Sequence, residues 1–442
     1  MITYERVNQL RAQTENVQRH GLWIHVLCTL LLMLLTFSAP GREGPSFIGS
    51  FDAIALAKLA VRVLGMFILG IAIARSWHQP GRRAVARCLL PVGLYLGWSI
   101  LSTFWSPLKS VSLGQAGGLL AQVMLVFVVA LRCSGPQDSS KILYHLSMAM
   151  LAFSTAVLIS DTISHEASGL DRSLSSGFVH PTAAGATASL GIVILFAARL
   201  LWGWWWSRIL LVPGLLIHSV LLVLAASRTA MAMGLVTVLL SFFLFSRRLF
   251  FRAVTVIFCV AALGYVVADP GLELADRAFI SVKQYAQRGE THEQMRSFTG
   301  RTILWEAIWD SFTESPVIGH GYFVTSKHGE IDVWGNPPNV TAHNVLLQVL
   351  VSTGLIDGIL FSWGLIQSVG TCSKSLLGDP LNRKLAAFVG ILGIWYFGWG
   401  MLCSSFMGPV RPESVVFYTL LGLALGSLSS DRQAKCFFDQ RG

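Results

Sequence analysis

Long apolar segments recur along most of this chain and are separated by short polar connections. Each is close to the roughly 17 to 25 residues that an α-helix needs to cross the hydrocarbon core of a bilayer. We predict spans at 21–39, 53–74, 88–105, 112–131, 142–160, 182–202, 207–225, 229–246, 250–268, 343–370, 385–405 and 413–429. The pattern therefore predicts an all-α polytopic membrane protein with about twelve transmembrane helices. The first segment is too long for a signal-peptide core and many spans follow it, so we expect it to be retained as a helix.

One long polar segment interrupts this pattern and divides the chain into three parts. Residues 1–268 carry the first nine spans, residues 269–342 form a large loop domain, and residues 343–442 carry the last three spans and a tail. The loop is rich in aromatic residues, a composition that favours a folded segment over a disordered one. Apolar residues recur at helical spacing from 304 to 312, which predicts an amphipathic helix on the bundle or on the membrane surface.

Lysines and arginines are concentrated in every second connection between the predicted spans. The basic connections hold Arg6, Arg11 and Arg19; Arg75, Arg82, Arg83 and Arg87; Arg132 and Lys141; Arg199 and Arg208; Arg247, Arg248 and Arg252; Lys374, Arg383 and Lys384; and Arg432, Lys435 and Arg441. The short connections between them carry one basic residue each: Arg42, Lys109, Arg172, Arg228 and Arg411. Because cytoplasmic connections carry the excess of positive charge, we expect both termini in the cytoplasm and the loop 269–342 on the outer side.

Composition agrees with a membrane protein and argues against a nucleic-acid partner. The chain is 53% hydrophobic and 13% charged, against about 25% charged residues in soluble proteins. Its net charge of +10 is dispersed among the apolar segments and is explained by the topology. The seven cysteines lie singly, without a Cys-x-x-Cys pair, so neither a disulfide framework nor a thiolate metal site is indicated.

Five basic residues of the chain could converge on one outward-facing cavity. Lys58 and Arg62 share one face of the second span, Arg228 and Arg411 stand at the outward ends of spans, and Arg301 lies in the loop. Guanidinium groups bind two phosphate oxygens at once, so such a cluster favours a diphosphate ligand. Snorkelling or ion pairing explains the two intramembrane cations equally well, and headgroup contacts explain the terminal arginines.

His343 is the candidate catalytic residue, and Asn344 directly follows it at the start of the tenth predicted span. A histidine accepts a proton near neutral pH and can activate a hydroxyl nucleophile. The alternative is a helix-terminal histidine bonded to backbone. We expect His320 and His328 to be solvated in the loop, and Asp357 to form an ion pair between helices.

No metal site is predicted. The acidic pair Glu330 and Asp332 could hold a divalent ion, but two acids in a polar loop are more often solvated.

The combination of motifs resembles the O-antigen ligase and O-antigen polymerase superfamily of bacterial envelope membrane proteins. The matching motifs are Ser227-Arg228, Arg301-Thr-Ile-Leu-Trp305, Pro316-Val-Ile-Gly319-His-Gly321, Ala342-His343-Asn344 and Gly354-Leu355. The rest of the chain matches in hydropathy alone.

The resemblance implies a glycosyltransferase of the lipid-linked-donor type, with a GT-C-like bundle of twelve helices in the bacterial inner membrane. Arg228 and Arg301 would bind the diphosphate of an undecaprenyl-diphosphate glycan, and His343 would deprotonate or position a hydroxyl of the lipid A-core acceptor. The periplasmic loop would cap the site, with inversion at the anomeric carbon and no metal or other cofactor. Membrane lipids are the other expected partners, and no protein partner is required.

Two other functions stay open at this stage. A polymerase would use a second undecaprenyl-linked glycan as acceptor and would show the same motifs. A polysaccharide or lipid transporter also has many spans and intramembrane charges, but we find no repeats or paired broken helices in matching halves. One dominant loop with a single arginine–tryptophan motif favours the ligase.

Overall fold

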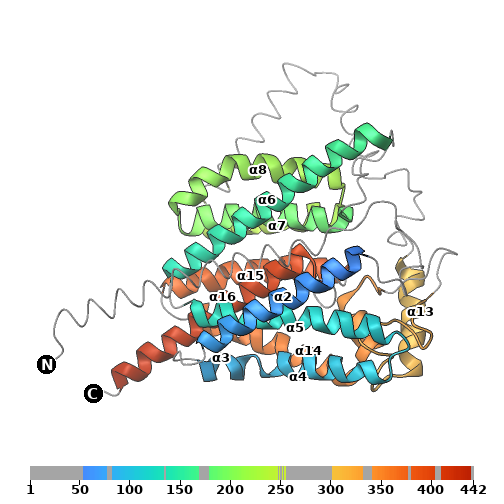
Figure 1. Cartoon of the computed structure of the whole chain (residues 1–442). Coiled ribbons are helices and arrows are strands. Elements are labelled where there is room, and N and C mark those ends of the chain that lie inside the picture. Colours follow the sequence, from blue (N-terminus) through green and yellow to red (C-terminus); the bar gives the residue numbers. More distant parts are fainter. Residues whose placement is uncertain are drawn as a thin grey trace.

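A computed structural model describes residues 53–76, 82–133, 136–168, 179–246, 301–331, 341–376, 380–403 and 410–439, with isolated positions between 248 and 254 (Figure 1). Helices occupy ten of the twelve predicted spans. The other two, 21–39 and 250–268, lie outside the described residues. The helices are α2 (Ala53–Ser76), α3 (Arg82–Cys88), α4 (Leu90–Leu101), α5 (Lys109–Arg132), α6 (Pro136–Ser168), α7 (Pro181–Leu201), α8 (Trp205–Ala225), α9 (Arg228–Phe245), α13 (Arg301–Glu314), α14 (Val345–Leu376), α15 (Pro380–Gly400) and α16 (Pro412–Asp439), with a 3-10 turn, η2 (Ser102–Phe104).

The part of the chain that the structure describes is helical, as expected of a multi-pass membrane protein. Within the described residues, six helices are long and apolar enough to cross a bilayer: α5, α6, α7, α8, α9 and the first 26 residues of α14. Apolar side chains of α8 such as Ile209, Val212 and Leu216 are more than 60% exposed, as expected of a surface that faces lipid. Pro213 lies inside α8 and does not end it.

Small residues let the helices around α7 approach closely. Gly191 of α7 faces the imidazole of His218 on α8, and Gly234 of α9 faces Ser189. A side chain at either glycine would overlap its neighbour, because an added Cβ would lie 2.4 Å from His218 in the first case and 2.5 Å from Ser189 in the second. Small residues at helix crossings are the usual basis of association in a membrane, where burial of apolar surface provides no driving force.

Helix α14 is not the continuous span that the sequence predicts. Gly354 adopts φ 73° and ψ −169°, and the helix kinks there. The segment that follows α13 fills the kink: Leu355 N–H donates to the Pro316 carbonyl (2.8 Å), and Gly321 N–H donates to the Ser352 carbonyl (2.7 Å). These bonds satisfy backbone groups that the kink removes from the helical ladder.

Helix α13 lies across one end of the bundle (Figure 1). Its buried face, Leu304, Ile308 and Phe312, forms a small core with Ala342 and Val351, as the amphipathic pattern predicts. The two tryptophans of the pattern lie outside this core.

The segment after α13 is tied to the turn between α4 and α5. Tyr322 N–H donates to Ser102 Oγ (2.8 Å), and Ser112 Oγ donates to the Tyr322 carbonyl (2.8 Å). The prediction that His320 is solvated is wrong, because its ring is buried and Nε2 donates to the Ser311 carbonyl (2.8 Å). His328 is exposed, as expected.

Candidate active site at one end of the bundle

Four candidate residues stand at helix starts. Arg228 begins α9 and Arg301 begins α13, while His343 lies two residues before α14 and Arg411 directly precedes α16. The charge pattern of the sequence predicts that these helix starts face the outside, and this orientation stays a prediction.

His343 lies in a positively charged and largely buried environment outside the membrane-spanning part of α14. Burial lowers the pKa of His343 to about 4, and the positive charges of Arg301, Arg411 and His180 act in the same direction. The imidazole is therefore neutral at pH 7 and keeps a lone pair that can accept a proton. The structure thus brings His343, Arg301 and Arg411 into electrostatic contact.

The backbone around His343 is fixed by side chains of two helices. His343 itself adopts φ 49°, a left-handed conformation that side chains rarely take. Its neighbour Ala342 is held at both backbone groups: Trp305 Nε1 donates to the carbonyl (3.0 Å), and the N–H donates to Gln348 Oε1 (2.7 Å). An unusual backbone conformation held in this way is typical of functional sites.

Asn344 has a structural role in these contacts. Its Oδ1 accepts from the N–H groups of Leu346 (2.9 Å) and Leu347 (3.1 Å), so Asn344 is the N-cap of α14. Its Nδ2 donates to the Met401 carbonyl at the end of α15 (3.2 Å). The side chain thus joins two helix ends beside His343 and has few groups left for a substrate.

Glu413 is a buried acid next to the site, and the sequence reasoning missed it. It lies in the first turn of α16 with no exposed surface, and its Oε1 is 4.0 Å from Arg411 Nη1. The charges of Arg301, Arg411 and Glu413 all act on the buried Cys403, which places the four groups together. An acid at a helix start is common because of the helix dipole, so Glu413 carried no distinct signal in the sequence.

The position of Arg228 is set by a tight turn and a close packing contact. Ala226 takes φ 46° at the end of α8, and the chain enters α9 two residues later. Gly185 of α7 packs against Ser227, where an added Cβ would lie 2.6 Å from the serine Cβ. His180, which contributes to the low pKa of His343, is the N-cap of α7. It lies five residues before Gly185, about 7.5 Å along the helix axis.

Arg62, another predicted cation, donates from Nη1 to the Gly114 carbonyl of α5 (3.1 Å). The side chain of Lys58 is not among the described ones, so its role stays a prediction. The expected ion pair of Asp357 is wrong for the described part of the chain. Its Oδ2 accepts from Ser99 of α4 (3.2 Å), and no interaction with a cation is found there.

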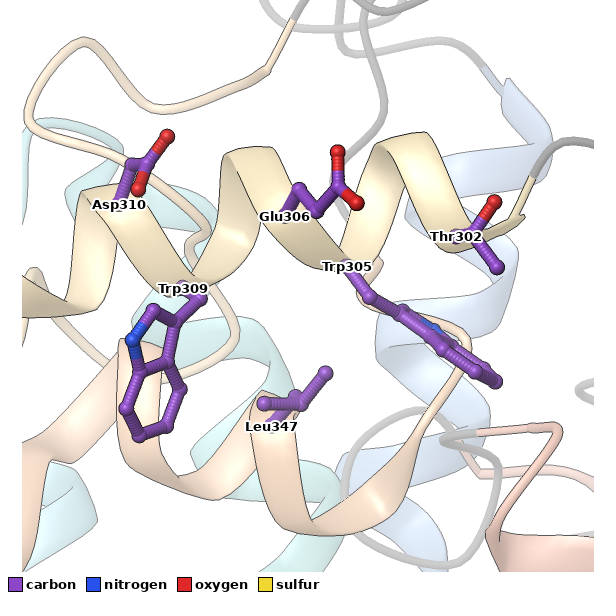
Figure 2. A pocket seen from close by; sticks show the side chains of 6 residues that line it. All are labelled: Thr302, Trp305, Glu306, Trp309, Asp310 and Leu347. Carbon is purple, nitrogen blue, oxygen red and sulfur yellow. The ribbon is translucent and has the colours of Figure 1, made fainter.

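A groove of about 430 Å³ runs beside the site, between α13 and the first turn of α14. It is lined by Thr302, Trp305, Glu306, Trp309, Asp310 and Leu347 (Figure 2). Within the described ranges, no group of three or more histidine, cysteine or acidic side chains comes together in a way that could hold a metal ion.

Comparison with known proteins shows a family similarity in the part of the chain that holds three of the candidate residues. The profile described as O-Antigen ligase matches residues 213–362, a range that includes Arg228, Arg301 and His343. Over these residues the chain is similar to the O-antigen ligase and polymerase superfamily. It is also 26% identical over 349 residues to the exopolysaccharide production protein ExoQ of Rhizobium meliloti (strain 1021), and the alignment covers 74% of each chain. Arg411 and Glu413 lie beyond the part that the O-antigen ligase profile matches.

Proposed function

We propose that this protein is an O-antigen ligase that transfers a glycan from undecaprenyl diphosphate to a hydroxyl group of the lipid A-core oligosaccharide. The observation that carries the proposal is the neutral imidazole of His343 beside Arg301 and Arg411, because a base and two phosphate-binding groups are what such a transfer needs. The profile match over residues 213–362 supports the same reaction class.

The proposed reaction is a single inverting displacement. The oxygen of the acceptor hydroxyl forms a bond to the anomeric carbon of the donor sugar as the bond from that carbon to the diphosphate oxygen breaks. His343 takes the hydroxyl proton, and the leaving diphosphate takes the electron pair of the broken bond. Arg228, Arg301 and Arg411 would stabilise the negative charge on the leaving group.

Through the arginines, the pKa of His343 would depend on whether the donor is bound. Burial is the main cause of the low pKa of His343, the positive charges of Arg301 and Arg411 lower it further, and a bound diphosphate would offset those charges. The pKa of His343 would then rise once the donor is in place, making the imidazole a better proton acceptor when it is needed.

The proposal extends to the cellular setting. We infer an inner-membrane protein with twelve transmembrane helices in a GT-C-like arrangement, both termini in the cytoplasm and the site facing the periplasm. The alternation of basic connections supports this orientation. The reaction would need no metal or other cofactor, since the arginines supply the positive charge that a metal ion supplies in other transferases.

A polymerase that extends an exopolysaccharide or O-antigen is the second candidate. The similarity to ExoQ, a protein of exopolysaccharide production, favours it. Both reactions would use the same residues toward the donor and would differ only in the acceptor.

The test is to incubate purified protein, in the presence of a chelator, with an undecaprenyl-diphosphate glycan and a rough lipopolysaccharide acceptor. Glycan transferred to the lipopolysaccharide is the expected result. Elongation of the lipid-linked glycan instead would assign the protein to the polymerases, and the absence of both products would contradict a transfer function.

A further inference from the structure

The groove between α13 and α14 combines two indole rings with an acidic rim. Trp305 and Trp309 lie along one flank of α13 with Leu347 opposite, while Glu306 and Asp310 point to the outside of the helix (Figure 2). The Trp309 side chain is 50% exposed, although its ring is large and apolar. The carboxylates of Glu306 and Asp310 are exposed and make no ion pair or side-chain hydrogen bond within the described part of the chain.

We propose that this groove binds a sugar ring of the acceptor glycan, and that it accepts neutral or amine-bearing sugars and rejects acidic ones. The C–H face of a pyranose ring is apolar and stacks on indole, while its hydroxyl groups donate hydrogen bonds to carboxylates. A lining that combines aromatic and aliphatic side chains with a few polar groups is typical of small-molecule sites.

The groove is tied to the backbone next to His343. Trp305, which lines it, donates its indole N–H to the carbonyl of Ala342, the residue before His343 (3.0 Å). Leu347 lies in the first turn of α14 and follows His343 by four residues. A sugar held in the groove would therefore lie next to the imidazole. That this sugar belongs to the acceptor rests on the proposed function, in which His343 addresses the acceptor hydroxyl.

The negative charge of Glu306 and Asp310 favours a glycan over lipid headgroups as the partner of the two tryptophans. Exposed tryptophans also occur at the headgroup level of membrane proteins. Bacterial membranes carry anionic lipids, and two carboxylates that have no cationic partner among the described residues would be repelled by them. Hydroxyl-rich neutral sugars meet no such penalty. The same repulsion would exclude uronic acids and phosphorylated sugars from the groove.

The variant Trp309→Ala tests the groove, and Ile303→Ala is its matched control. Ile303 lies on another flank of α13 outside the groove and is 54% exposed, against 50% for Trp309. Neither substitution removes a buried side chain, so both variants should fold. We expect the Trp309 variant to lose about tenfold in affinity for a sugar ligand, the usual order for an aromatic contact.

The readout is saturation-transfer NMR on the full-length protein in detergent, which needs no catalysis. The probes are neutral pentasaccharides of glucose, galactose and N-acetylglucosamine, with a pentasaccharide of galacturonic acid as the acidic counterpart. We expect saturation transfer to at least one neutral probe, its loss in Trp309→Ala and its retention in Ile303→Ala. The combined change Glu306→Gln with Asp310→Asn should admit the acidic probe.

The result separates this inference from the proposed function. The sugar site would be overturned if no neutral probe shows an NMR saturation-transfer signal, or if the signal is equal in the two alanine variants. This holds even if ligation is intact. Binding that depends on Trp309 in a protein without ligase or polymerase activity would keep the sugar site and reject the proposed function. Wild-type binding of the acidic probe as strong as that of the neutral ones would overturn the charge selection.

Discussion

The low pKa of His343 makes a testable statement about the pH dependence of the reaction. A drop from 6.5 to about 4 corresponds to about 3 kcal/mol in favour of the neutral imidazole. At pH 7 only about one molecule in a thousand then carries a protonated His343. Because the neutral form is the active base, activity is present above this pKa and is lost as the pH falls through it.

The perturbation is Arg301→Gln. It removes the positive charge that, after burial, does most to lower the pKa of His343. Burial and Arg411 remain, so the pKa of His343 should rise but stay below 6.5. Arg301→Lys keeps the positive charge and should leave the acid limb of the pH profile close to that of the wild type. The arginine-to-lysine control separates the effect of charge from that of a lost donor contact.

The assay is the initial rate of transfer against pH, with donor and acceptor varied in turn. The ratio kcat/KM for the donor reports the free enzyme and should show an acid limb near pH 4 in the wild type. The ratio kcat/KM for the acceptor, measured at saturating donor, reports the donor-bound enzyme. Its acid limb should lie at a higher pH, because bound diphosphate raises the pKa of His343. A wild-type limb between pH 6 and 7 in free enzyme, or a limb that Arg301→Gln does not move, would refute the reasoning.

Three further predictions concern how the site is held. Gly185→Ala should displace the turn before α9 and weaken donor binding at least tenfold, since the new Cβ would lie 2.6 Å from the Ser227 side chain. The control is Gly117→Ala, whose Cβ meets nothing within 4 Å, and thermal stability and donor binding are measured for both variants. Gly354→Ala should lower the melting temperature by several degrees, because φ is 73° and the new Cβ would overlap a backbone carbonyl; an unchanged melting temperature would contradict the kink. Trp305→Phe should cost about 1 kcal/mol by leaving the Ala342 carbonyl without its donor, and we expect a lower kcat with unchanged donor affinity.

The transmembrane part of the fold could be predicted because the bilayer fixes the length of an apolar helix. Segments 112–131 and 182–202 became α5 and α7 with boundaries shifted by a few residues. The alternation of basic connections predicts that Arg228, Arg301 and Arg411 share one side of the membrane, since charge bias identifies which helix ends share a face, and this stays a prediction. The electrostatic contact of Arg301 and Arg411 with His343 needed the structure.

Features that depend on contacts between distant segments could not be read from the sequence. The kink at Gly354 exists because Leu355 bonds to the Pro316 carbonyl, and no local pattern encodes that pairing. His320 reads as a polar loop residue until its partner Ser311 is known. The capping role of Asn344 is different: asparagine before an apolar helix is a recognised N-cap signal, and it could have been predicted.

The most direct test of the account is to separate donor binding from transfer in two variants. His343→Ala should abolish transfer to rough lipopolysaccharide while the affinity for the undecaprenyl-diphosphate glycan stays within about twofold of the wild type. Arg301→Ala should weaken the same affinity by at least tenfold, about the 1.4 kcal/mol or more expected for a charged hydrogen bond to phosphate. A His343→Ala protein with full transfer activity would contradict the central claim.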